Sequence, residues 1–194
     1  MSGQAIEFEF RLDEGEFAAL TQKLHELSGN KARTYIARAL NKTATSARVK
    51  LANKAQASYT VKSGGFKKDA RIEKASAGNL TAYIKSEGKP LDIVRFKSAK
   101  NTPKKGGAGA KADIVRSGLK QIHASEPKAF KASKKGHGQI FYREGKARTP
   151  ILKVKSKSVP YMLGNDQRVW SPTRPQIESD LKKFMQQQIK QLVG

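Results

Sequence analysis

The sequence contains no cysteine, one tryptophan and only three histidines among its 194 residues. Without cysteine, the chain forms no disulfide and offers no thiolate for zinc binding or nucleophilic catalysis. Its stability must therefore come from packing or from association with other subunits. The sequence also lacks a run of about 18 apolar residues and a signal-peptide pattern at its N-terminus. We therefore expect a soluble protein that is made in the cytoplasm and does not contact a membrane.

Acidic residues are scarce, because 16 Asp and Glu stand against 39 Lys and Arg, for a formal net charge of +23. A protein this basic repels copies of itself unless an anion is near. Nucleic acid is the commonest anionic partner, since each neutralised phosphate releases a counterion, although an acidic protein surface would also serve. The length and a hydrophobic content of 37% predict a single domain over residues 1–194.

No pattern of catalytic or metal-binding residues is present. His25, His123 and His137 lie in unrelated segments, and none has a second histidine or a carboxylate at ligand spacing. The glycine-rich residues 106–111 lack the second glycine before the lysine and the following Ser or Thr of a phosphate-binding loop. We therefore predict a protein that is not an enzyme and that binds no cofactor and no metal.

The N-terminal part predicts a strand and two helices. Residues 6–12 alternate between apolar and charged side chains, as in a half-buried strand. Asp13 resembles a helix N-cap, and apolar residues at helical spacing follow it to Leu27. Asn30 is placed to cap a second, longer helix over residues 31–58. The apolar stripe of this helix is made mostly of small residues, which predicts a closely packed neighbour: Ala32, Ile36, Ala39, Leu40, Thr43, Ala47, Leu51 and Ala55.

The remaining sequence, residues 66–160 above all, predicts short strands around a basic loop. Strand-like segments occupy residues 70–74, 80–85, 91–96, 113–116, 139–143 and 151–155, and residues 135–138 resemble a turn. Residues 97–111 are rich in Gly, Ala and Lys without periodic apolar residues, which predicts a flexible loop. Residues 161–170 are expected to be irregular, and an apolar stripe predicts a C-terminal helix over residues 173–193. The predicted fold class is α+β, with helices packed on one antiparallel sheet.

Positive charge is concentrated in one segment of the chain. Residues 97–157 hold 17 basic and three acidic residues, a local net charge of +14, whereas the first 27 residues hold two basic and six acidic residues, a net charge of −4. At this density we favour a contact surface for an anionic partner over a merely solvated face. The residues predicted to make this contact are Lys97, Lys100, Lys104, Lys105, Lys111, Lys131, Lys134, Lys135, Arg143, Lys146 and Arg148.

The sequence contains no helix-turn-helix, no zinc finger and no basic region followed by heptads, which are patterns that read DNA bases. Its aromatic residues do not form an RNA-reading motif either. Contact with double-stranded DNA is therefore expected to be with phosphates. The basic residues along the helix at 31–58 fit two interpretations equally, a helix that follows a DNA backbone or a core helix with a solvated face. In a homo-oligomer, acidic N-terminal surfaces would also be able to dock on basic surfaces of neighbouring copies.

Two stretches carry a family likeness: ARALNKTATSARVKLANKAQA at residues 37–57, and AFKASKKGHGQIFYREGKARTPILKVKSKSVPYM at residues 129–162. The first resembles the N-terminal helix of the phage minor tail protein Z family, and the second resembles that family's central block. Residues 90–96, followed by a basic glycine-rich stretch, also fit, so the likeness runs from about Arg33 to Pro160. The matching positions in the central block are Ala129, Phe130, Gly136, His137, Phe141, Arg143, Arg148, Pro150, Ile151, Val159 and Pro160.

This resemblance implies a structural tail-completion protein of a long-tailed phage or prophage, located in the virion near the head-proximal end of the tail or the neck. It further implies a hexamer-like homo-oligomeric ring that helps to join head and tail and to position or pass DNA. Its partners would be other tail or neck proteins, such as the tail terminator, tube and tape-measure proteins. The alternative, from the charge alone, is a free protein that binds nucleic acid without sequence specificity.

Overall fold

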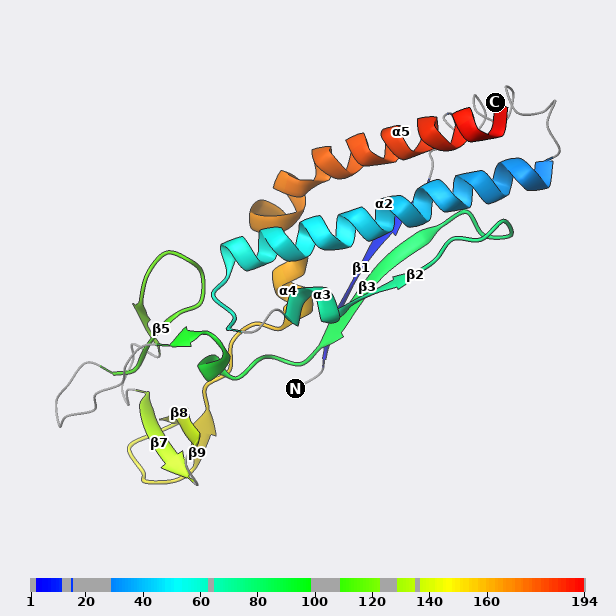
Figure 1. The fold of residues 1–194 in the computed structure, drawn as a ribbon. Helices are drawn as coiled ribbons and strands as arrows, with labels where there is room; N and C mark the ends of the chain where they lie inside the picture. The colour runs from blue at the N-terminus through cyan, green and yellow to red at the C-terminus, as the bar shows by residue number, and fades with distance from the viewer. Residues whose placement is uncertain are drawn as a thin grey trace.

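Two long helices lie side by side on one side of a three-stranded sheet, and two further small sheets lie beyond the end of the first helix (Figure 1). These helices are α2 (Gly29–Ser58) and α5 (Ser171–Val193). The mixture of helices and small antiparallel sheets confirms the predicted α+β class. The computed structural model describes residues 3–11, 15, 29–62, 65–98, 109–122, 129–134 and 137–193.

The sheet beneath α2 consists of β1 (Gln4–Phe10), β2 (Ala70–Glu73) and β3 (Ala82–Gly88), antiparallel in the order β1-β3-β2. Its inner face packs on α2 and on residues 159–163, and Phe8 and Phe10 are both buried. Alternate residues such as Glu7 and Glu9 point outward and are exposed. The strands predicted at residues 6–12, 70–74 and 80–85 are therefore present, with shifted ends.

Helix α2 follows its predicted span closely, and every residue of its predicted small-residue stripe is buried. Ala37, Ala44 and Ala52 are buried as well, so neighbouring elements contact this helix on more than one side. The predicted N-cap is wrong, because the helix begins at Gly29 and Asn30 lies within its first turn. There the backbone carbonyl of Asn30 accepts a hydrogen bond from the Thr34 hydroxyl at 2.9 Å.

Helix α5 lies along α2 and confirms the predicted C-terminal helix, although it begins at Ser171. A polar cluster joins the two helices. The Lys50 ammonium donates to Asp180 Oδ2 at 2.6 Å and to the Gln176 carbonyl at 3.2 Å, and the Ser46 hydroxyl donates to the same Asp180 oxygen. Burial acts to raise the pKa of Asp180, but the hydrogen bonds from Lys50 and Ser46 outweigh it, so the pKa lies below its ordinary value.

The two further sheets replace the single sheet that the sequence predicts. One has the order β4-β5-β6 and the other β7-β8-β9, and both are antiparallel. Strands β6 and β7 were not predicted, and His137 and Gly138, predicted to lie in a turn, belong to β8. The bounds are β4 (Lys97–Ser98), β5 (Lys111–Asp113), β6 (Lys120–Gln121), β7 (Phe130–Lys134), β8 (His137–Arg143) and β9 (Ile151–Lys153).

Residues 91–96 are not the predicted strand. They form the 3-10 turn η1 (Ile93–Arg95), closed by a hydrogen bond from the Phe96 amide to the Ile93 carbonyl at 3.1 Å. Ile93 and Phe96 are both buried, and a strand would place residues three apart on opposite faces. The turn brings both side chains to the core, which explains the difference.

The loop predicted at residues 97–111 begins and ends in strands, since Lys97 pairs with Asp113 and Lys111 pairs with Gln121. Residues 99–108 of that loop and most of the helix predicted at residues 13–27 lie outside the described residues. The strands predicted at 113–116 and 151–155 are shorter than expected. Val115 and Lys155 instead form isolated bridges with Tyr59 and Asp92.

Residues 161–170 are helical and not irregular. They belong to α4 (Val159–Leu163) and to a π-helical turn, η2 (Asp166–Trp170), and a further short helix is α3 (Gly65–Lys68). The Ser158 hydroxyl accepts a hydrogen bond from the Tyr161 amide, and the Asn165 side chain accepts one from the Arg168 amide. Side-chain caps of this kind stabilise short helices whose periodicity is too brief to recognise. Among the described residues, no helix is long and apolar enough to span a membrane.

We predict that Leu40→Ala or Leu51→Ala lowers the free energy of unfolding by about 2–5 kcal/mol. Both side chains are almost completely buried in α2, so truncation removes apolar contacts and leaves a cavity. Denaturant titration measures the effect, with Asn53→Ala, an exposed change on the same helix, as the control. Equal stability of the leucine variants and the control would contradict the described packing of α2.

We predict that Asp180→Asn removes a pH-dependent part of the stability. Because the folded-state pKa of Asp180 is lowered, its carboxylate stabilises the fold above the unfolded-state pKa, and this contribution is lost as pH falls through the folded-state pKa. The free energy of unfolding should therefore differ most between wild type and variant at neutral pH, and the difference should shrink towards about pH 3. A difference that is constant over this range would show that the ion pair with Lys50 is not formed.

Candidate functional site

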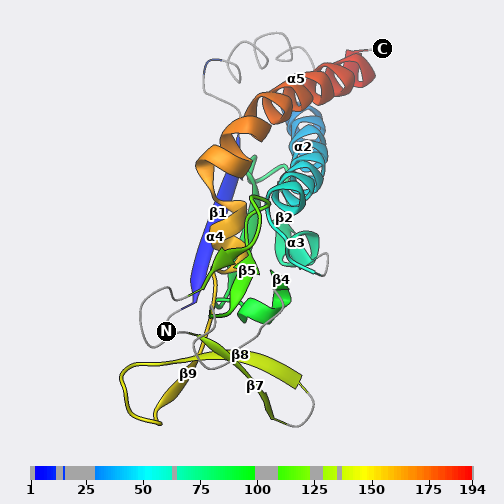
Figure 2. The same ribbon diagram turned by 90° about the vertical axis from the view of Figure 1, so that its left-hand side faces the viewer.

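The two further sheets form what we call the distal basic part, which comprises the described residues between 92 and 157. It lies beyond the C-terminal end of α2, away from α5 (Figures 1 and 2). Residues 59–62, which follow the end of α2, hold the distal basic part in place through backbone hydrogen bonds to residues 95, 97 and 114. The Thr60 amide donates to the Ile114 carbonyl at 3.1 Å, the Lys62 amide to the Arg95 carbonyl at 2.8 Å, and the Lys97 amide to the Thr60 carbonyl at 3.1 Å.

Small side chains let the strands of the distal basic part approach one another. Ala110, Ala112 and Ala129 are buried, and the Ala110 amide donates a hydrogen bond to the Ala129 carbonyl at 3.0 Å. Ile140 and Val154 are also buried, and the Val154 amide donates to the Ile140 carbonyl at 2.9 Å. This small core leaves the long charged side chains on the outside.

Some of the predicted contact residues can be placed in this part. Lys97 and Lys111 are exposed on the adjacent strands β4 and β5. Lys146 and Arg148 are exposed in the loop between β8 and β9, and Arg143 is half-buried at the end of β8. Lys131 and Lys134 belong to β7, but the structure does not describe their side chains. The remaining predicted contact residues lie outside the described residues: Lys100, Lys104, Lys105 and Lys135.

The structure adds basic residues that were not singled out in the sequence. Their common feature is exposure on a short strand or a connecting turn: Arg95, Arg116, Lys120, Lys153, Lys155 and Lys157. All except Arg95 fall within the basic segment at residues 97–157, so the local charge density already indicated them. The individual side chains could not be selected because their exposure depends on how the small sheets pack.

The positive charge of the distal basic part is not neutralised internally. Among the described residues, the ion pairs lie in β1, β2 and β3, just after β1, between α2 and α5, and within α5. None of them involves a basic side chain between residues 92 and 157. Such a surface is repelled by copies of itself and attracts phosphates or carboxylates.

Arg143 is held by an aromatic ring. Its guanidinium carbon lies 4.9 Å from the centre of the Phe130 ring, and Phe130 in turn lies 6.4 Å from the ring of Phe141. The register of β7 and β8, which pairs Phe130 with Phe141, makes this stacking possible. The buried Nε of Arg143 has no hydrogen-bond partner in the described structure. A guanidinium stacked in this way offers planar donors to a phosphate or carboxylate.

The described residues contain no group of three or more His, Asp or Glu side chains that would hold a metal ion. The altered pKa values outside the α2–α5 cluster have structural causes. Burial raises the pKa of Tyr59, and hydrogen bonds with Glu73 and then Glu7 raise the pKa of Lys85. The site therefore offers charge and hydrogen-bond donors for binding.

Comparison with known proteins agrees with the resemblance of the two sequence stretches. The family model for the prophage minor tail protein Z matches residues 18–193, which is nearly the whole chain. No curated protein and no solved structure matches the chain. The match includes α2, the distal basic part and α5. The chain belongs to the prophage minor tail protein Z family, whose members are structural components of the phage tail.

Proposed function

We propose that this protein is a tail-completion subunit that forms a ring near the head-proximal end of the tail and helps to join head and tail. In this proposal the distal basic part contacts the phosphates of DNA that is positioned in, or passes through, the ring. The observation that supports it is the gathering of exposed basic side chains at one end of the molecule, which none of the ion pairs among the described residues involves. Other tail or neck proteins, such as the tail terminator, tube and tape-measure proteins, would be its neighbours.

A ring would strengthen the contact with DNA. Each subunit would bring its own distal basic part to a shared space, so several weak phosphate contacts would act together. The distal basic part consists of short strands and loops, without a long helix to enter the major groove. Its DNA contacts would therefore be independent of sequence, as a protein that must accept any passing DNA requires.

Imaging of complete tails by electron microscopy tests the position and the ring. We expect a ring of density for this protein at the head-proximal end, with the distal basic part facing the central channel. A protein that is absent from purified particles would contradict the proposal. A distal basic part that faces open solvent, away from DNA and from other tail proteins, would contradict its DNA-facing role.

We predict that Lys146→Gln with Arg148→Gln weakens binding to short duplex DNA and lowers its salt dependence. If each side chain contacts one phosphate, the slope of log K against log salt should fall by about 2, because each contact contributes roughly 0.9. Fluorescence anisotropy at several salt concentrations measures this slope. The matched control is Lys182→Gln with Lys183→Gln, which removes the same charge from the exposed side of α5.

An equal loss in the control would show that total charge decides binding and not the distal basic part. The same titration separates the proposal from a free nucleic-acid-binding protein. Tight DNA binding by an isolated monomer, with a steep salt slope, would favour the free protein. Binding that becomes tight only in the assembled ring favours the proposed function.

We predict that replacing Lys104, Lys105 and Lys111 with Ala leaves the fold almost as stable as wild type but reduces infectivity or DNA retention. Lys111 is exposed on β5, and residues 99–108, which contain Lys104 and Lys105, include no large apolar side chain that would join a core. Each surface change of this kind usually alters stability by no more than about 0.5 kcal/mol. Thermal unfolding and a phage complementation assay give the two measurements. A large loss of thermal stability would mean that this segment contributes to the packed core.

A further inference from the structure

The sheet beneath α2 has an outer face on which no described element packs. We call it the open sheet face. Strand alternation places every second residue there, and all of these side chains are exposed or half-buried. It carries four acidic and two basic residues, in contrast with the positive net charge of the whole chain. The polar residues of the open sheet face are Glu7, Glu9, Arg71, Glu73, Tyr83, Lys85 and Glu87.

An aromatic ring lies between two carboxylates at the centre of this face. Tyr83 on β3 pairs with Glu9 on β1 and with Glu73 on β2, so an acidic residue stands on each side of it. Lys85 is shared between Glu7 at 3.1 Å and Glu73 at 2.8 Å, and its ammonium lies 5.2 Å from the centre of the Tyr83 ring. Arg11 lies 3.7 Å from Glu9, so this carboxylate has a basic neighbour as well. A surplus of negative charge remains, because Glu7, Glu9, Glu73 and Glu87 stand against Arg11, Arg71 and Lys85. The side chains of Glu9 and Glu73 are 45% and 57% exposed, so both can reach a partner.

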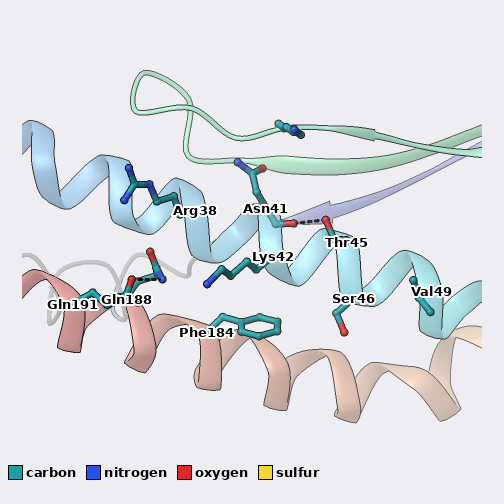
Figure 3. Close-up of a pocket in the computed structure, with 10 residues that line it drawn as sticks. Arg38, Asn41, Lys42, Thr45, Ser46, Val49, Phe184, Gln188 and Gln191 are labelled. Carbon is teal, nitrogen blue, oxygen red and sulfur yellow. Dashed lines mark hydrogen bonds between the residues drawn. The ribbon is translucent and has the colours of Figure 1, made fainter.

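A groove lined by basic residues lies on the side of the molecule formed by the two long helices. It lies between α2 and the C-terminal half of α5 and has a volume of about 840 Å³ (Figure 3). The basic residues among its lining are Arg38, Lys42 and Lys74, and no acidic residue is among the described side chains that line it. The half-buried ring of Phe184 contributes an apolar surface. We call this the α2–α5 groove.

One polar atom in the α2–α5 groove lacks a partner. Gln188 is only 3% exposed, and its Nε2 donates to the Gln191 side chain at 3.1 Å. Its Oε1 has no hydrogen bond in the described structure. An acceptor buried without a partner costs free energy, so such an atom in a groove indicates that a donor is supplied from outside.

We propose that the open sheet face of one copy docks on the α2–α5 groove of a second copy. The Tyr83 ring packs on Phe184, and the Tyr83 hydroxyl donates to Gln188 Oε1. Glu9 and Glu73 meet the basic side chains of the groove. The occupant is a second copy because this chain itself presents the required aromatic ring, hydroxyl donor and pair of carboxylates in one row of neighbouring strands.

This contact joins two different surfaces, so it is head-to-tail and repeats from copy to copy, which closes into a ring at the right rotation. The inference therefore rests on the ring in the proposed function. It also leaves the distal basic part of every copy free for DNA. Glu73 lies on the open sheet face and the next residue, Lys74, lines the groove, so the two surfaces of one copy meet at the end of β2.

Charge reversal tests the electrostatic match in the full-length protein. We expect Glu9→Lys with Glu73→Lys to weaken self-association about tenfold or more, as measured by analytical ultracentrifugation at low salt. Adding Arg38→Glu and Lys42→Glu to that variant should restore most of the association. The matched control, Glu144→Lys with Glu178→Lys, changes the charge equally away from both surfaces and should associate far better than the first variant. Circular dichroism melting confirms that each variant is folded.

A second pair of variants tests the proposed hydrogen bond without any change of charge. Tyr83→Phe and Gln188→Met should each weaken self-association several-fold, and the double variant should be little weaker than either single one. Additive effects, or no effect, would overturn the pairing of Tyr83 with Gln188.

The outcomes separate this inference from the proposed function. A ring in purified tails that survives the charge reversal would overturn these docking surfaces and leave the ring in place. A protein that stays monomeric at every attainable concentration, and is not part of a ring in tails, would overturn both. Equal weakening by the control variant would show that total charge governs association, which also overturns the proposed surfaces.

Discussion

The close approach of α2 to its neighbours is the constraint on which the rest of the structure depends. Alanine occupies most of its buried positions, so α5 and the sheet can both lie close to the helix. Small side chains supply little apolar area each, and the contact gains its stability from length and from the Lys50–Asp180 cluster. With the helix fixed in this way, both the α2–α5 groove and the position of the distal basic part are determined.

Among the described residues, paired and unpaired charges lie in different parts of the molecule. The ion pairs of the described structure lie in the part built from β1–β3 and the long helices. The ion pairs described in the structure include none of the lysines or arginines of the distal basic part. A subunit of this kind has little tendency to associate through its basic end, which separates the surface available for subunit contacts from the surface available for an anionic partner.

The sequence allowed the long helices and the first sheet to be predicted because their signals are local and repeated. The alanine stripe of α2 and the alternation in β1 extend over several turns or residues, so single substitutions do not obscure them. The segment at 91–96 was misread because its aliphatic residues resemble a strand, whereas the core requires Ile93 and Phe96 on the same side. The division into three small sheets depends on which strands pair, and alternation within one strand carries no information about its partner.

The sequence predicted which region of the chain holds the candidate site, but not how the side chains of that region are arranged. Charge density indicated residues 97–157, yet the stacking of Arg143 on Phe130 depends on the register of β7 with β8. Gln188 could not have been recognised, because it is an ordinary polar residue on a helix until α2 covers it. The same holds for Tyr83, because its acidic neighbours lie on two other strands, and Glu9 on β1 is far away in the sequence.

The junction at residues 59–62 has a mechanical consequence. Several backbone hydrogen bonds cross it side by side, joining the end of α2 to β4, η1 and the residues after β5. A force on the distal basic part is therefore shared among these hydrogen bonds and transmitted along the axis of the 30-residue helix α2. No flexible linker separates the two parts at this junction. A partner bound at the distal end and the body of the subunit would therefore move as one rigid unit.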